Sequence, residues 1–196
     1  QLLLKTSMNL PDDEAIYKEV QAKLPGIKPF LSAFTLALPA LLKQKKEMSS
    51  QVLQLLGSKT AINGYLEIGS TCRYISELKK HIQLKGILYV SNDIAPNNSI
   101  ADMFERGQVT KFGTFIDLNN YAAIRPQQIP DESIDLVTCH IGLHHCPHTL
   151  LEGYIQSIHR ILRKDGLFIL RDHDVKTDEM ATFVSLVHTV FNLGLN

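Results

Sequence analysis

The sequence predicts an α/β fold built on a doubly wound, mostly parallel sheet, with an all-helical extension at its N-terminus. Strand-like and helix-like segments alternate after Gly64, which is typical of right-handed βαβ units. Apolar runs at residues 134–137 and 167–170 are nearly continuous, as in parallel strands that are buried on both faces. Before residue 57, apolar residues recur at helical spacing and no run has the pattern of a strand.

The helical extension is expected to cover residues 1–60. Ile16, Val20 and Leu24 are spaced as on one face of a helix, and the Pro-Gly pair at residues 25–26 ends that run. A second helix, interrupted at Pro39, is expected over about residues 28–46. Ser49 can cap a short third helix that ends near residue 56. We expect these helices to form a lid or wall over the crevice of the sheet.

The α/β core is expected to cover residues 61–196. Its strands are expected at residues 65–68, 87–91, 109–112, 134–139 and 167–171. Its helices are expected at residues 72–83, 99–106, 150–162 and 179–193.

The composition of the chain argues against two classes of partner, nucleic acid and membrane. Twenty basic residues balance twenty acidic ones, so a bulk nucleic-acid binder is not expected. The longest apolar stretch, residues 30–42, contains Pro39 and is too short to span a bilayer. Three cysteines without paired spacing indicate a reducing compartment. We therefore expect a soluble, cytoplasmic protein without a membrane partner. Its oligomeric state is left open.

Two predicted strands break into acidic residues at their carboxyl ends. The segment YLEIGST, residues 65–71, passes from an apolar run through Glu67 into a Gly/Ser/Thr turn that can open a helix. The run at residues 87–91 is followed by Asp93. In open α/β sheets, ligands bind outside the carboxyl ends of the strands, where a turn offers backbone N–H groups and a carboxylate reaches ribose hydroxyls. The pattern predicts an adenosine-containing ligand.

YLEIGS at residues 65–70 resembles the first motif of class I S-adenosylmethionine-dependent methyltransferases, a Rossmann-like superfamily. Further matches follow in the family's order: Asp93 after the second strand, PDESIDLV at 130–137, LHH at 143–145 and IHRILRKDGLFIL at 158–170. The resemblance covers about residues 64–175. It implies two more strands after the fifth, forming an antiparallel hairpin, but nothing after Val175 has the pattern of a strand. Either the natural chain continues or the sheet is incomplete, so the core is expected to lack these edge strands.

The resemblance implies S-adenosyl-L-methionine as the cofactor and assigns residues that bind it. Where the family has its second and third loop glycines, this chain has Thr71 and Arg73. Arg73 either pairs with the carboxylate of the cofactor's methionine part or is a solvated residue at a helix start. Adenine is expected after the third strand, near residues 113–115 or Asp117. The full set of predicted cofactor-binding residues is Glu67, Gly69, Ser70, Thr71, Arg73, Asp93, Ile94, Thr114, Phe115, Cys139 and His140.

Histidines gather after the fourth and fifth strands. A general base is needed if the acceptor is a hydroxyl or a carbon acid, but not if it is an amine or thiolate. His173 and His145 are the expected bases, with Asp172 orienting one of them; polarity of a loop before a helix is the alternative interpretation. Cys139, His140, His144, His145, Cys146 and His148 form a dense cluster. Because the spacing of zinc sites is missing, no metal is expected there.

The sequence therefore predicts methyl transfer from S-adenosylmethionine to a small or medium-sized acceptor. A non-catalytic domain of this fold, acting as a regulatory or interaction module in a larger protein, is the alternative, and the lost loop glycines favour it. A dehydrogenase is a weaker third interpretation because Gly-x-Gly-x-x-Gly is absent. Nothing in the sequence identifies the acceptor.

Overall fold

The structure, a computed structural model, describes residues 38–107, 109 and 113–195, together with residues 12, 15, 16, 18, 19, 22 and 23. Most of the predicted helix at residues 12–24, and the part of the second predicted helix before Leu38, lie outside the described residues. The chain divides into two compact units, one formed by residues 38–172 and the other by residues 1–37 with 173–196. Each unit is described by itself.

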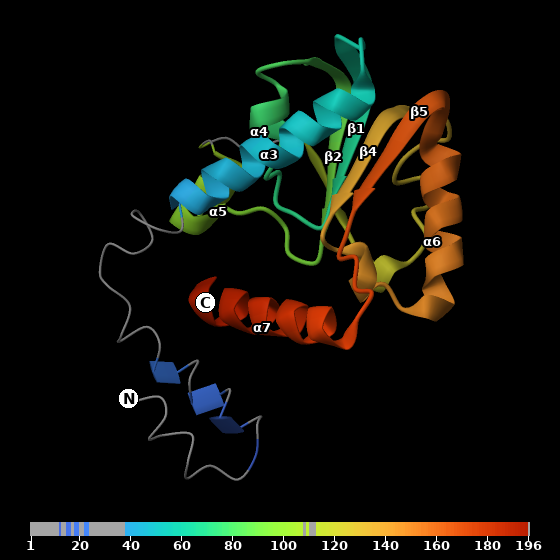
Figure 1. The fold of residues 1–196 in the computed structure, drawn as a ribbon. Coiled ribbons are helices and arrows are strands. Elements are labelled where there is room, and N and C mark those ends of the chain that lie inside the picture. Colours follow the sequence, from blue (N-terminus) through green and yellow to red (C-terminus); the bar gives the residue numbers. More distant parts are fainter. Residues whose placement is uncertain are drawn as a thin grey trace. The chain divides into compact units, whose positions relative to one another are not determined.

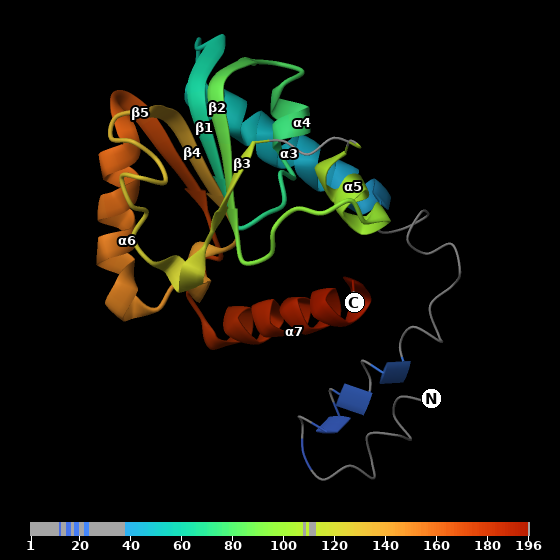
Figure 2. The same ribbon diagram turned by 180° about the vertical axis from the view of Figure 1, so that it is seen from behind.

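The first unit is built on one parallel sheet of five strands in the order β3-β2-β1-β4-β5. Figure 1 shows α6 on one face of this sheet and α3 and α4 on the other, and Figure 2 shows the same layers from behind. This arrangement confirms the predicted doubly wound α/β fold. Its strands are β1 (Ala61–Ile68), β2 (Gln83–Asn92), β3 (Thr114–Asp117), β4 (Ile134–His140) and β5 (Leu162–Arg171), and its helices are α3 (Leu38–Leu56), α4 (Ile75–Leu78), α5 (Ile100–Arg106) and α6 (His148–Ile161).

Helix α3 packs on the sheet as part of the first unit. Met48, Val52 and Leu56 are buried on its inner face, in a cluster with residues of β1 and α4. The helix continues through Ser49, which is buried in its middle, so the predicted break and cap at this serine are wrong. Pro39 lies at the start of the described part of this helix, and the predicted interruption there involves residues outside the described ones.

The predicted helix at residues 72–83 is much shorter in the structure. Only α4, at Ile75–Leu78, is helical, and β2 already begins at Gln83. The backbone N–H of Gln83 donates to the carbonyl of Thr60 at 3.0 Å, and Gln83 pairs with Ala61 in the sheet. The helix ends early because the chain must reach the start of this longer strand.

The third strand lies five residues later than predicted, at Thr114–Asp117 instead of 109–112. Of the predicted segment only Val109 is described, and it is exposed and outside any strand. Gly113 explains where β3 begins: its φ is +73°, and a Cβ there would lie 2.5 Å from the carbonyl oxygen of Leu88. The buried side chain in this strand is Ile116, which pairs with Ser91 of β2.

Apolar side chains fill both faces of the sheet. On one face, Tyr154, Ile158 and Ile161 of α6 pack in a cluster with β1 and β4. On the other, α3 and α4 cover Tyr65 and Leu136 of the same two strands. Burial on both faces explains why the central strands have nearly continuous apolar sequences.

The second unit contains α7 (Asp178–Leu195), close to the helix predicted at residues 179–193. Its described residues after Asp172 form no strand. No helix among the described residues of the chain is long and apolar enough to cross a membrane.

Candidate cofactor and acceptor site

The predicted site residues gather at the carboxyl edge of the sheet. Because all five strands are parallel, they present their carboxyl ends at one edge, as Figure 2 shows. Gly69 follows β1 and Asp93 follows β2, while Asp117 ends β3, His140 ends β4 and Asp172 follows β5. In doubly wound sheets this edge is where ligands bind.

The side chain of Glu67 forms hydrogen bonds that stabilise the turn after β1. Its carboxylate is buried and accepts hydrogen bonds from the hydroxyl of Tyr65 at 3.2 Å, from the hydroxyl of Ser70, and from the backbone N–H of Tyr74 at 3.2 Å. Burial raises its pKa, and the hydrogen bond from Ser70 is the main opposing effect. The carboxylate thus positions the turn through its hydrogen bonds with Ser70 and Tyr74. The sequence alone did not predict these two partners.

The turn itself leaves room above Gly69. Its φ is +79°, no atom of the described residues lies within 4 Å of where a Cβ would be, and its N–H donates to the carbonyl of Ser91 at 2.8 Å. Cys72 takes the other left-handed conformation of the turn, with φ of 74°, where a glycine is usually preferred. The hydroxyl of Thr71 is buried without a hydrogen-bond partner among the described residues. Arg73 is half-buried, and its N–H donates to the Ser70 hydroxyl at 3.2 Å.

Asp93 and Ile94 form an open turn after β2. Both are exposed, and the side chain of Asn92 donates to the carbonyl of Ile94 at 3.2 Å. The described part of the chain contains no hydrogen bond or ion pair to the Asp93 carboxylate. This carboxylate is therefore able to accept hydrogen bonds from a ligand.

The corrected position of β3 separates the residues predicted for adenine. Thr114 and Phe115 lie at the start of the strand, whereas Asp117 lies at its carboxyl end. The Asp117 carboxylate accepts from the N–H of Asn119 at 2.8 Å, and residues 119–121 all have positive φ. A cavity of about 200 Å³ is lined here by residues of β3, the turn after it and α6. The structure brings Asp117, and not Thr114 or Phe115, to the carboxyl edge.

Cys139 and His140 end β4 as buried, uncharged groups. Burial, with a smaller effect of Asp172, raises the pKa of the Cys139 thiol to about 12. Burial, with a smaller effect of Arg171, lowers the pKa of His140 to about 4. The His140 ring packs edge-on against Tyr74 with centroids 4.7 Å apart, and neither ring nitrogen has a hydrogen-bond partner among the described residues. At neutral pH the edge therefore carries a neutral imidazole.

Asp172 contacts His144, a residue that the sequence did not single out as a base. The Asp172 Oδ1 lies 2.6 Å from Nδ1 of His144, and its Oδ2 accepts from the His144 backbone N–H at 3.0 Å. The ring of His145 lies beside that of His144, with centroids 4.0 Å apart. The only signal in the sequence was the shared position of residues 144 and 172 at strand exits.

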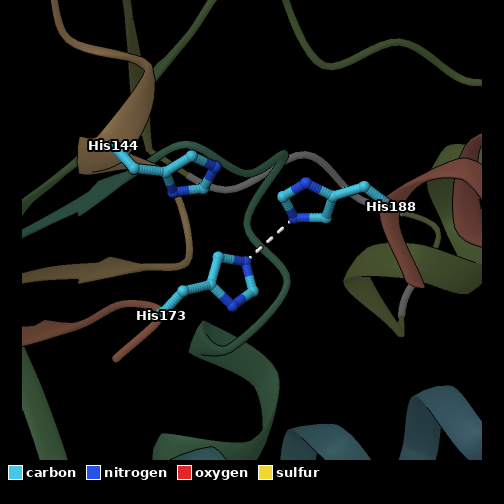
Figure 3. Close-up of side chains that lie close together, drawn as sticks. All are labelled: His144, His173 and His188. Carbon is cyan, nitrogen blue, oxygen red and sulfur yellow. Dashed lines mark hydrogen bonds between the residues drawn. The ribbon is translucent and has the colours of Figure 1, made fainter. Parts of the chain in front are cut away.

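His173 belongs to the second unit and contacts α7. Its Nε2 lies 2.9 Å from Nε2 of His188, the interaction drawn as a dashed line in Figure 3. The predicted His/Cys cluster does not converge on one point. The members of this cluster are Cys139, His140, His144, His145, Cys146 and His148. Within residues 38–107, 109 and 113–195, no three of these side chains bring potential metal-ligand atoms within 4.8 Å of one another.

Comparison with known proteins agrees with this geometry. The sequence model of the family described as "Methyltransferase domain" matches residues 66–170, over half of the chain. Comparison with curated proteins found no matching sequence. Among solved structures, a putative S-adenosyl-L-methionine-dependent methyltransferase from Methanococcus maripaludis is similar, with 16% identity, a TM-score of 0.50, and coverage of 94% of this chain and 74% of that one.

Two further structures share the fold. The CurJ carbon methyltransferase has 16% identity and a TM-score of 0.54 over 92% of this chain and 52% of that one. YcgJ from Bacillus subtilis has 21% identity and a TM-score of 0.50 over 74% of this chain and 58% of that one. The chain thus spans little more than half the length of these two proteins.

Proposed function

The chain belongs to the methyltransferase domain family, and we propose that it transfers a methyl group from S-adenosyl-L-methionine to a small or medium-sized acceptor. The observation that carries the proposal is the match over residues 66–170, which takes in the turn after β1 and the exits of β2, β3 and β4. These are the places where a parallel sheet binds a nucleotide.

The residues at the edge fit an adenosine-containing cofactor. Open space above Gly69 allows a ligand to approach the backbone, as glycine permits in such turns. The buried Thr71 hydroxyl and the His140 ring nitrogens have no hydrogen-bond partner in the described part of the chain, and buried polar groups normally have one. We propose that the turn from Gly69 to Arg73 holds the methionine part, with Cys139 and His140 beside it.

We propose the ribose and adenine contacts on the neighbouring strands. Asp93 accepts from both ribose hydroxyls, and Ile94 covers one side of the nucleoside. Asp117 is favoured for the adenine amino group because it ends β3, whereas Thr114 and Phe115 lie at the strand's beginning. The cofactor supplies an activated methyl group on a sulfonium, so the protein mainly has to align it with the acceptor.

Acceptor-side roles are proposed for Asp172, His145 and His173, as the sequence suggested. The segment before Leu38, which the sequence predicts to be helical, is proposed as part of a lid or wall that selects the acceptor. None of Cys72, Cys139 and Cys146 forms a disulfide, which supports the proposal of a cytoplasmic location.

A non-catalytic module is the second candidate function. It is favoured by Thr71 and Arg73, which stand where the family has loop glycines. Such a module has no need to bind the cofactor. Binding of S-adenosylmethionine therefore separates the two candidates.

The experiment is a calorimetric titration of the wild type and of Asp93→Ala with S-adenosylhomocysteine. Loss of a two-point, charged hydrogen bond should cost about 2–3 kcal/mol, or roughly 30- to 150-fold in Kd. Asp165→Ala is the matched control, because Asp165 is an exposed aspartate in the first half of β5. Equal affinity of the wild type and Asp93→Ala, with circular dichroism unchanged, would refute the ribose assignment.

A further inference from the structure

His144 and Asp172 form a dyad that is fixed at two points. Asp172 uses one carboxylate oxygen for the backbone N–H of His144, at 3.0 Å, and the other for the ring nitrogen Nδ1, at 2.6 Å. The two residues are 28 positions apart and follow neighbouring strands, β4 and β5. A carboxylate that binds both the main chain and the ring of a histidine sets the direction of that ring.

This contact also selects the tautomer of the ring. A carboxylate accepts hydrogen bonds, so it favours the form in which Nδ1 carries the proton. The lone pair then lies on Nε2. The side chain of His144 is 29% exposed, enough for an acceptor molecule to reach it, while that of Asp172 is 17% exposed.

The turn that carries His144 is held on several sides. The N–H of Ile141 donates to the carbonyl of Arg171 at 2.6 Å, which ties the exits of β4 and β5 together. The Tyr121 hydroxyl donates to the carbonyl of Gly142 at 2.5 Å. Ile141 has φ of 57°, an outlier for a β-branched residue, and such strain gathers at functional sites.

The dyad also lies on the acceptor side of the proposed cofactor site. In the strand order β2-β1-β4-β5, the ribose and methionine parts are proposed over β2 and β1. His144 follows β4 and Asp172 follows β5, and β4 is the strand next to β1. A group placed here is next to the point where an acceptor must meet the methyl group.

We propose that His144, oriented by Asp172, is the general base of the reaction and that the acceptor enters the site protonated, as a hydroxyl or an acidic C–H. This proposal rests on the proposed methyl transfer. When the acceptor atom bonds to the methyl carbon, its proton passes to Nε2 of His144. The electron pair of the breaking carbon–sulfur bond stays on sulfur, which becomes a neutral thioether. Asp172 stabilises the imidazolium until the proton leaves to solvent.

The neighbouring histidines fit this role less well. His140 is buried, neither of its ring nitrogens contacts a carboxylate of the described residues, and its lowered pKa of about 4 makes it a weak base. His145 stacks beside His144, whose ring nitrogen Nδ1 and backbone N–H both contact Asp172. Paired with a carboxylate at Nδ1, His144 combines a fixed ring direction with a lone pair on Nε2.

Nitrogen-detected NMR of the histidine rings tests the dyad without a known acceptor. At pH 7.5, the neutral ring of His144 should carry its proton on Nδ1, whereas a neutral histidine side chain in water favours Nε2. Asp172→Asn should shift His144 toward the Nε2 form, and His144→Gln assigns its signal. His159→Gln, an exposed histidine of α6, is the control that should leave the signal unchanged. A wild-type His144 protonated on Nε2 overturns the proposal.

Turnover supplies the second measurement. With 4-methylumbelliferone as a hydroxyl probe and 4-nitrothiophenol as a probe that is already ionised, His144→Gln should lower kcat about 10²–10⁴-fold for the first and little for the second. The Kd for S-adenosylhomocysteine should stay the same. Equal loss with both probes, or no loss with the hydroxyl probe, overturns the base assignment. If the wild type binds no cofactor, the proposed function is refuted instead. The tautomer of the His144 ring, measured by NMR, then still tests the contact between His144 and Asp172.

Discussion

Removal of the Glu67 carboxylate should destabilise the fold through the turn after β1. In Glu67→Ala, the N–H of Tyr74 and the hydroxyl of Ser70 lose their acceptor in a buried place, while the hydroxyl of Tyr65 keeps Thr138 at 2.7 Å. Each orphaned donor costs about 1–3 kcal/mol. Because the variant also removes a buried group whose raised pKa shows a desolvation cost, we expect a net loss of about 2–4 kcal/mol.

Urea unfolding followed by far-UV circular dichroism and tyrosine fluorescence measures this loss. Glu67→Gln keeps one acceptor oxygen and should lose about half as much free energy of unfolding. Glu152→Ala is the control: this exposed carboxylate of α6 accepts one hydrogen bond from Gln156, at 3.0 Å, and should change stability by less than about 0.5 kcal/mol. If Glu67→Ala were as stable as Glu152→Ala, the reasoning about the turn would be wrong.

Two further predictions concern His140 and Gly64. The pKa of His140 is lowered from 6.5 to about 4, so between these two pH values the folded protein binds fewer protons than the unfolded chain. As the pH falls from 6.5 to about 4, up to about 3 kcal/mol of the free energy of unfolding should therefore be lost. His140→Gln should remove this part of the pH dependence in urea midpoints; parallel curves for the two proteins would contradict it. Gly64→Ala should cost at least about 3 kcal/mol, because φ is +85° and its Cβ would lie 2.4 Å from the carbonyl oxygen of Ser133. Gly57→Ala, where φ is +61° and no atom of the described residues lies within 4 Å of the added Cβ, should cost only about 1–2 kcal/mol, and equal losses in the two variants would refute the steric argument.

The sheet could be predicted because its central strands are buried on both faces. Residues of β1 and β4 must be apolar over most of their length, and that pattern is visible without any knowledge of neighbours. The edge strand β5 was predicted from its own apolar run at residues 167–170, although Ile169 is its one buried residue. The exits of β1 and β2 were also visible, since Glu67 and Asp93 interrupt apolar runs. The local sequence was sufficient for prediction wherever the structure of a segment depends on that segment alone.

Prediction was wrong where pairing between segments decided the structure. Residues 109–112 resemble a strand as much as 114–117 do, and pairing with β2, together with the positive φ of Gly113, selects the second segment. The helix before β2 is cut short because β2 begins at Gln83, which pairs with Ala61.

The directions of the histidine rings depended on the fold as well. In the sequence His173 directly follows Asp172, whereas His144 lies 28 positions before it, so the sequence alone favoured His173 as its partner. The 2.6 Å contact to His144 follows from how the exits of β4 and β5 meet. Spacing along a loop does not encode that direction.

Calorimetric titration of the wild type with S-adenosylmethionine, and with NAD as a comparison, tests the central claim most directly. We predict one-to-one, saturable binding of S-adenosylmethionine and no binding of NAD. Binding of NAD alone would indicate a dehydrogenase. No heat of binding from either compound at millimolar concentration, from a protein that is folded by circular dichroism, would contradict the account and favour a non-catalytic module.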